Sequence, residues 1–165
     1  MGIQAGVGKW LLSLALLIGG MAQAKELTNR LGVGFSNQFV QDLPSLAVRY
    51  YPSSDLGLSG SLGVDTEKDN SRFGLRAQIY RVIFMEDNLN FYIGGGGGLL
   101  SIETKGKNES GFELSGFLGA EFFFYGLDSL AFLLEVGVEI LSFSNQVRFR
   151  TVGDHPFQAG MVFYF

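Results

Sequence analysis

The chain has 165 residues, a mass of 18.0 kDa and a net charge of −4, with 24 glycines, 16 phenylalanines and no cysteine. This length suits a single domain. The lack of cysteine excludes a disulfide scaffold, a thiolate metal site and a cysteine nucleophile, and the negative charge argues against nucleic acid as a partner. Glycine is about twice its usual share of roughly 7%, which beside so many phenylalanines is unusual for a water-soluble globule.

Residues 1–24 have the composition of an export signal. Lys9 and the amino terminus supply positive charge, an apolar core covers residues 10–18, and Ala22-Gln-Ala24 has the small-x-small form of a cleavage site. The apolar core is too short for a membrane-spanning helix, which needs about 20 residues. We therefore predict a cleavable signal peptide over residues 1–24 and a mature domain over residues 25–165. An uncleaved membrane anchor is the alternative.

From residue 29 onward, apolar residues occupy every second position in runs that polar turns separate. The clearest run, residues 56–65, places Leu58, Leu62 and Val64 opposite glycines, serines and Asp65. A period of two is typical of strands with one face in an apolar medium, and it fits better than helical spacing. Eight strands are predicted, over residues 30–39, 45–50, 56–65, 72–83, 91–104, 112–124, 130–140 and 157–165.

The residues opposite the apolar face indicate that the apolar face meets lipid. A soluble sandwich or a lipocalin-like barrel would bury its apolar face and cover the other face with large polar side chains. Here the other face is rich in glycine, as the narrow interior of an eight-stranded barrel requires. We therefore predict an all-β fold, an eight-stranded antiparallel up-and-down transmembrane β-barrel. The predicted inward glycines are Gly32, Gly34, Gly57, Gly63, Gly74, Gly119, Gly137 and Gly160.

Seven charged residues fall on the predicted inward face. Within one narrow lumen, opposite charges must pair to be tolerated. We therefore predict a charge network in the lumen, the alternative being separate solvation on an outer surface. Its members are Arg49, Arg72, Arg76, Glu113, Glu121, Glu135 and Glu139.

Aromatic residues gather near the predicted strand ends, as in the two girdles of a transmembrane barrel. Connections at one rim are short, whereas those at the other include the longer segments 66–71, 105–111 and 145–156. Short periplasmic turns and longer outer loops are typical of outer-membrane barrels. The periplasmic girdle is predicted to contain Tyr50, Tyr51, Phe84, Phe91, Tyr92, residues 122–125, Phe132 and residues 163–165, and the outer girdle Phe39, Phe73, Phe112, Phe143 and Phe157.

Across residues 25–165 the chain resembles the small eight-stranded outer-membrane barrels of Gram-negative bacteria, of the OmpA-barrel and OmpX type. The most specific part is the C-terminal segment, which resembles the terminal assembly signal of that family: Phe157, Ala159, Met161, Phe163 and Phe165 alternate and end the chain. The resemblance implies a bacterial outer-membrane location, contact with outer-membrane lipid and lipopolysaccharide, insertion by the barrel-assembly machinery, and a monomer.

Motifs for chemistry are weak. Some barrels of this size modify lipid A with a histidine, a serine and an acidic partner. The one histidine here is His155, and Phe157 stands where a deacylase-like pattern has serine. Residues 65–70 lack the glycine and closing glutamate of a calcium loop, and residues 94–98 lack the ending of a phosphate loop. No catalytic residue, cofactor or metal site is predicted.

The sequence thus favours a structural or surface-interaction role of the adhesin kind, with Arg148, Phe149 and Arg150 of the longest outer loop as candidate contacts. These residues alternate with Val147 and Thr151, so we expect this loop to extend the hairpin above the membrane. Three alternatives stay open: a narrow passive channel for small solutes, a secreted lipocalin-like barrel that binds an apolar ligand, and a lipid A-modifying enzyme. The interior of eight strands is just wide enough for side chains, which argues against an open channel. The facing of residues 94–98 is also left open.

Overall fold

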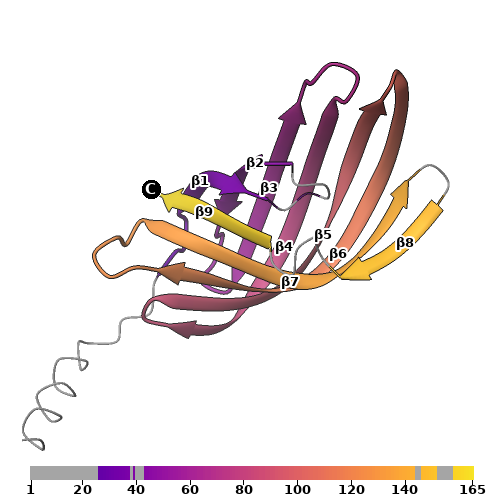
Figure 1. Ribbon diagram of the computed structural model, residues 1–165. Coiled ribbons are helices and arrows are strands. Elements are labelled where there is room, and N and C mark those ends of the chain that lie inside the picture. The colour runs from indigo at the N-terminus through magenta and orange to yellow at the C-terminus, as the bar shows by residue number, and fades with distance from the viewer. Residues whose placement is uncertain (1–25, 38, 40–42, 144–145, 152–157) are drawn as a thin grey trace, which may run out of the picture.

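The computed structural model describes residues 26–37, 39, 43–143, 146–151 and 158–165 (Figure 1). The predicted signal peptide, His155 and Phe157 lie outside the described residues. Alternating apolar residues with few helix-favouring stretches produce nine strands in the described part. The strands are β1 (Leu31–Ser36), β2 (Ser45–Tyr50), β3 (Leu56–Asp65), β4 (Arg72–Glu86), β5 (Leu89–Thr104), β6 (Lys107–Phe123), β7 (Leu130–Phe143), β8 (Gln146–Thr151) and β9 (Gln158–Tyr164).

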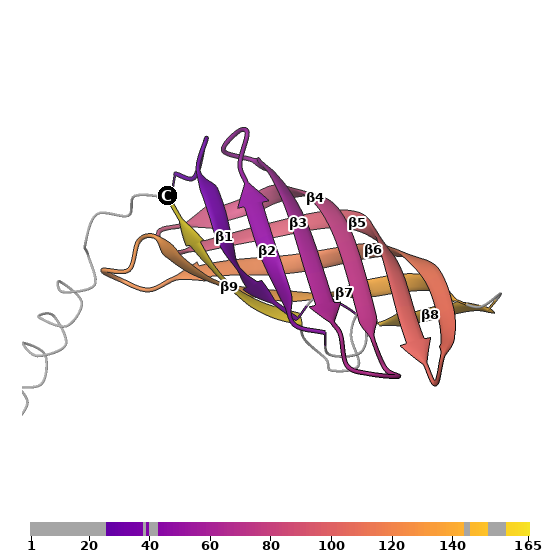
Figure 2. The ribbon, with the colours of Figure 1, turned by 90° about the horizontal axis from the view of Figure 1, so that it is seen from above.

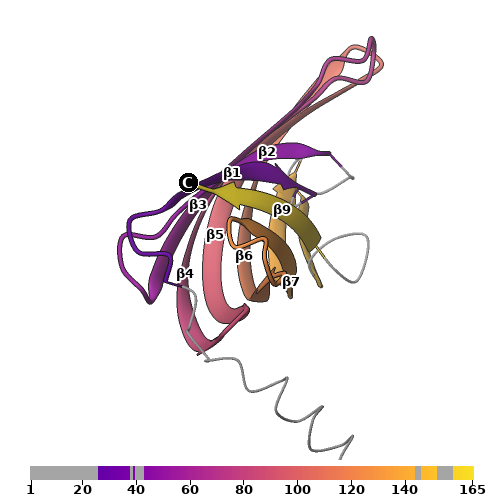
Figure 3. The ribbon, with the colours of Figure 1, turned by 90° about the vertical axis from the view of Figure 1, so that its left-hand side faces the viewer.

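The strands form one antiparallel sheet that closes on itself. β1 to β7 pair in chain order, and β9 lies between β7 and β1, which completes the ring. Figure 2 shows the tilted strands side by side, and Figure 3 shows them around a common axis. Closure gives each described strand of the ring, β1 to β7 and β9, a partner strand on both sides. The predicted eight-stranded antiparallel barrel is therefore confirmed.

The eighth position of the ring is shared by two strands. β9 pairs with residues 130–135 of β7, and β8 pairs with residues 138–143 on the same edge. Figure 1 shows β8 continuing beside the far end of β7. The sequence predicted a connection over residues 145–156. Within that connection the structure extends the β7 hairpin through residues 146–151, as their alternation indicated, and Val147 and Phe149 continue the apolar alternation of β7.

The β5–β6 connection is also tighter than predicted. A loop was expected over residues 105–111, but only Lys105 and Gly106 separate the two strands. Both have positive φ, 51° and 75°, which matches the two-residue hairpin turn that suits the twist of antiparallel strands. The β5–β6 hairpin therefore extends well beyond the short strands β1 and β2 (Figure 1).

The barrel is apolar outside and polar inside. Phe35, Ile83 and Leu99 point outward and are about 60% exposed, whereas Arg49 and Glu121 point inward and are at most 1% exposed. A water-soluble barrel has the opposite arrangement. Two rims are named hereafter: the C-terminal rim, where β9 ends, and the loop rim, where the β3–β4 and β5–β6 turns lie.

The facing of residues 94–98 follows from their neighbours. A Cβ atom on Gly94 would lie 2.6 Å from Cβ of the inward Tyr80, and one on Gly96 would lie 2.6 Å from Cγ of the inward Gln78. Gly94, Gly96 and Gly98 therefore face the lumen, and residues 95 and 97 face outward.

The predicted aromatic girdles are partly wrong. Tyr51, Tyr92, Phe123 and Tyr164 were assigned to the rim surface, but each points into the lumen and is at most 1% exposed. Their sequence neighbours point outward instead, as alternation requires. At the loop rim, Phe39 is also buried and Phe143 packs against an interior cluster, while Phe73 and Phe112 remain exposed.

Candidate functional site

Arg49 of β2 lies at the centre of the first of two buried ion clusters in the lumen. Its Nη1 lies 3.3 Å from Oε1 of Glu121 on β6, and its Nη2 lies 3.4 Å from Oε1 of Glu135 on β7. All three side chains are at most 1% exposed. This group, the Arg49 cluster, joins strands from opposite sides of the barrel.

The Arg49 cluster has one arginine and two carboxylates, and tyrosine hydroxyls donate further hydrogen bonds to both carboxylates. Tyr51 and Tyr164 donate to Glu121 at 2.6 and 2.5 Å, and Tyr92 donates to Glu135 at 2.8 Å. The guanidinium carbon of Arg49 also lies 4.3 Å from the ring centre of Tyr80, a cation–π contact. A buried ion cluster is tolerated only when its polar groups are satisfied in this way.

Glycines opposite the tyrosines make room for their rings. Gly57 pairs across the sheet with Tyr80, and Gly119 pairs with Tyr92. A Cβ atom on Gly57 would lie 2.1 Å from the Tyr80 ring, and one on Gly119 would lie 2.3 Å from the Tyr92 ring. Gly57 and Gly119 therefore pack against tyrosine rings, and these glycine–tyrosine pairs fill the lumen near the C-terminal rim.

Arg76 of β4 lies in the second ion cluster, nearer the loop rim. Its Nε donates a hydrogen bond to Glu113 of β6, and its Nη2 lies 3.8 Å from Oε2 of Glu139 on β7. Arg150 of β8 lies 3.6 Å from the other oxygen of Glu139. This group, the Arg76 cluster, has two positive and two negative side chains.

The two clusters differ in how fully their polar atoms are bonded. Oε2 of Glu113, Nε2 of Gln78 and Oγ of Ser115 are buried and have no hydrogen-bond partner within the described residues. Buried polar atoms usually bind ordered water when no protein group reaches them. Around Arg49, where tyrosines fill the lumen, fewer buried atoms lack such a partner, among them Nε of Arg49 and the hydroxyl of Tyr80. Internal water is therefore expected mainly in the layer around the Arg76 cluster.

An apolar cap covers the Arg76 cluster on the side of the loop rim. Phe39 and Leu43, which lie between β1 and β2, are 2% and 4% exposed and pack with Leu100 and Leu141. The Phe39 ring centre lies 5.3 Å from the Arg76 guanidinium carbon. The inward glycines of β3 and β4 leave space for this cap, since Cβ atoms on Gly63 and Gly74 would approach Leu43 and Phe39 to within 3 Å.

The structure brings together Arg49, Glu121 and Glu135 in one cluster, and Arg76, Glu113 and Glu139 in the other. Arg72, the seventh residue of the predicted network, pairs instead with Asp65 at 2.8 Å and is 25% exposed. It lies at the last pair of the β3–β4 ladder, where its neighbour on β3 supplies the carboxylate.

The residues predicted as outer-loop contacts occupy strand β8. Arg150 faces the lumen in the Arg76 cluster, and Phe149 faces outward opposite Ile140 of β7. Arg148 is exposed. β8 continues the sheet and places these side chains on two faces, and their role as surface contacts stays a prediction.

The C-terminal residues predicted as an assembly signal form the closing strand. Ala159, Met161 and Phe163 point outward from β9, and Phe165 follows it and is 66% exposed. Tyr164, which the sequence analysis placed in a girdle, is the main interior contact of this segment. Because Phe163 and Phe165 face outward, alternation along the strand predicts that Tyr164, which lies between them, faces the lumen.

The site is thus a closed, charged lumen within an apolar-walled eight-stranded barrel. Among the described residues, no cluster of three or more side chains is arranged to hold a metal ion, and no helix is long and apolar enough to cross a membrane.

Comparisons with known proteins agree on the fold. The N-terminal β-barrel domain of OprF from Pseudomonas aeruginosa superposes with a TM-score of 0.55 at 15% sequence identity, covering 87% of this chain and all of that domain. No protein-family model matches the sequence, and no curated protein matches it. At this identity the likeness shows the fold alone: the chain shares the eight-stranded barrel of that domain, as the resemblance over residues 25–165 implied.

Proposed function

We propose that the protein is an integral barrel of the bacterial outer membrane with a structural or surface-interaction role. The observation that carries the proposal is the reversed polarity of the barrel, with exposed apolar side chains around a charged and filled interior. Its fold, shared with a barrel domain of OprF, supports the same location. We call the exposed apolar side chains on the outside of the barrel the belt. Lipid around the belt stabilises the protein, because apolar area removed from water contributes roughly 25 cal/mol per Å².

Cell fractionation tests the location. The expressed protein is expected in the outer-membrane fraction, with its N-terminus at residue 25 after removal of the predicted signal peptide. Unheated samples should migrate differently from boiled samples on gels, because a closed barrel resists detergent unfolding. Recovery as a soluble periplasmic protein would contradict the proposal and favour the lipocalin-like alternative.

The filled lumen argues against a passive channel. Four tyrosines fill the lumen around Arg49 near the C-terminal rim: Tyr51, Tyr80, Tyr92 and Tyr164. Leu27, which is 2% exposed, packs in the same cluster. Planar bilayers with the purified barrel should therefore show no reproducible conductance steps. Regular steps in the wild-type protein would show that this packing opens in a membrane.

The long hairpins at the loop rim support a role at the cell surface. The tips of β3–β4 and β5–β6 project beyond β1 and β2 (Figures 1 and 3). Residues 66–70 at one tip are exposed and mostly charged or amide-bearing. Replacing residues 66–71 with a two-residue turn should leave the barrel folded and reduce attachment of expressing cells to partner surfaces. Unchanged attachment would favour a purely structural role.

Catalysis is not part of the proposal. The described lumen contains no histidine, serine and carboxylate arranged as a triad, and its carboxylates are bonded to arginines and tyrosines. Replacing His155, which lies outside the described residues, should leave the acyl content of lipid A unchanged. An altered lipid A profile would restore the enzymatic alternative.

A further inference from the structure

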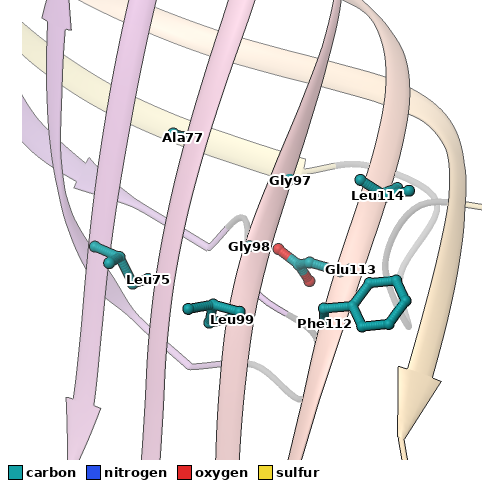
Figure 4. Close-up of a pocket in the computed structure, with 8 residues that line it drawn as sticks. All are labelled: Leu75, Ala77, Gly97, Gly98, Leu99, Phe112, Glu113 and Leu114. Atoms are coloured by element: carbon teal, nitrogen blue, oxygen red, sulfur yellow. The ribbon is translucent and has the colours of Figure 1, made fainter.

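The outward face of β4, β5 and β6 contains a groove in an otherwise bulky apolar surface. Two adjacent rows of paired residues across the three strands line it. The middle residue of one row has a large side chain, and the middle residue of the other row is a glycine. Because Gly97 has no side chain and Ala77 has only a methyl group, a space of about 310 Å³ remains beside Leu99 (Figure 4). The rows are Leu75, Leu99 and Phe112, and Ala77, Gly97 and Leu114.

A polar pocket lies next to this groove, toward the loop rim. It has a volume of about 230 Å³, and Ser101 and Asn108 line it from the outward face, whereas Asp65 and Arg72 occupy inward-facing positions at the same end of the β3–β4 hairpin. Ser101 is the next outward residue after Leu99 on β5, so the two spaces are separated by one outward step of about 7 Å. An apolar groove and a polar pocket therefore follow each other along the same strands.

The side chains of the polar pocket suit a neutral, hydroxyl-rich group. Ser71 donates a hydrogen bond to Glu103 and Ser101 donates one to Asn108, so the hydroxyl oxygens can accept from a ligand and the amide nitrogen of Asn108 can donate to it. Asp65 and Arg72, at inward-facing positions of the same hairpin end, compensate each other's charge. The outward ring of Phe73, 43% exposed, adds an apolar surface for the flat side of a sugar. A phosphate would need an excess of cationic donors, which the described lining does not contain.

We propose that this wall binds one membrane glycolipid, with an acyl chain in the groove and a sugar of the headgroup in the polar pocket. The proposal rests on the proposed membrane location, because the groove is supplied with lipid only when the belt is in a bilayer. The succession of groove and pocket matches the order of chain and headgroup in such a lipid. A second copy of the barrel would fill the groove but would leave the polar pocket without a matching group.

Native mass spectrometry of barrels reconstituted in phosphatidylcholine vesicles, with and without a disaccharide-headed glycolipid, tests the site. Wild-type protein is expected to retain one glycolipid and no phosphatidylcholine after transfer to detergent. Ala77→Leu fills the groove and should lower the retained fraction about tenfold, since it removes contacts with roughly two methylene groups. The matched control is Ala120→Leu, on the outward face near the C-terminal rim.

A second pair of variants tests the headgroup contacts. Asn108→Ala should lower glycolipid retention, whereas Glu109→Gln, at the next position of β6 and on its opposite face, should leave it unchanged. Gel mobility of unheated samples shows in each case whether the barrel is folded. Equal retention by Ala77→Leu and wild type, equal retention of both lipids, or a dimer in place of a lipid adduct would overturn the assignment.

Cell fractionation separates this inference from the proposed function. A folded barrel that is found in the outer membrane but retains no glycolipid contradicts only the lipid site. A barrel that is absent from the outer membrane contradicts the proposed function as well.

Discussion

Removal of Arg49 should destabilise the folded barrel strongly, because it leaves two carboxylates buried without a cation. Arg49 lies 3.3 Å from Glu121 and 3.4 Å from Glu135, and all three side chains are at most 1% exposed. Breaking a buried pair by removing one partner costs about 3–5 kcal/mol. We therefore expect Arg49→Met to lower the free energy of unfolding by about 3–5 kcal/mol, with tyrosine hydroxyls offsetting part of the loss.

A second substitution identifies the cause of that loss. Adding Glu135→Gln to Arg49→Met removes one of the two uncompensated charges and should recover part of the stability. A rescue of this kind is expected for a charge imbalance and not for a simple packing defect, since glutamine has nearly the same shape as glutamate. Without rescue, the loss would have to come from the cavity that the arginine leaves.

The measurement is urea unfolding in lipid vesicles, followed by gel mobility and circular dichroism. Tryptophan fluorescence is unsuitable because the one tryptophan, Trp10, lies in the predicted signal peptide. Arg81→Met is the matched control, since Arg81 is 73% exposed in its 3.2 Å pair with Asp55 and solvent screens that pair. Equal stability losses in Arg49→Met and Arg81→Met would refute the reasoning.

Three further outcomes are expected. Gly119→Ala should lower stability by about 1–3 kcal/mol, because the new methyl group would overlap the Tyr92 ring; Gly116→Ala, where a Cβ atom meets nothing within 4 Å, should be close to neutral in the same urea titration. Phe165→Ala should reduce the amount of barrel in the outer membrane of expressing cells, while in-vitro folding into vesicles continues; unchanged membrane levels would remove the assembly-signal prediction. Mass spectrometry of the exported protein should show Lys25 as the first residue, and an intact N-terminus would favour the anchor.

Alternation alone was enough for most of the barrel wall. A residue's parity decides its face in a strand, so Leu58 and Val64 could be placed outward and Arg49 and Glu121 inward without coordinates. The errors arose where aromatic residues near strand ends were assigned to the rim surface against the alternation of the strand. Tyr92 was assigned to a girdle because it lies near a strand end, whereas the structure places Phe91 outward and Tyr92 inside.

Strand ends were less predictable than strand faces. The alternation of residues 147–151 indicated a longer hairpin but not its partner, and β8 forms on the part of the β7 edge that lies beyond the end of β9. Phe39 shares the parity of the outward Phe35, but the chain has left the ladder after Ser36 and parity no longer applies. Alternation holds only while the backbone stays in a sheet.

The sequence by itself determined the class of fold, the outward apolar face and the inward charges, because each depends on local order with a period of two. Only the tertiary structure decided which charges meet. Arg49 and Glu121 are joined through the lumen, across the ring, and Arg72 finds Asp65 through hairpin register. Strand pairing, strand tilt and barrel closure set those distances, and the alternation within a single strand determines none of these three features.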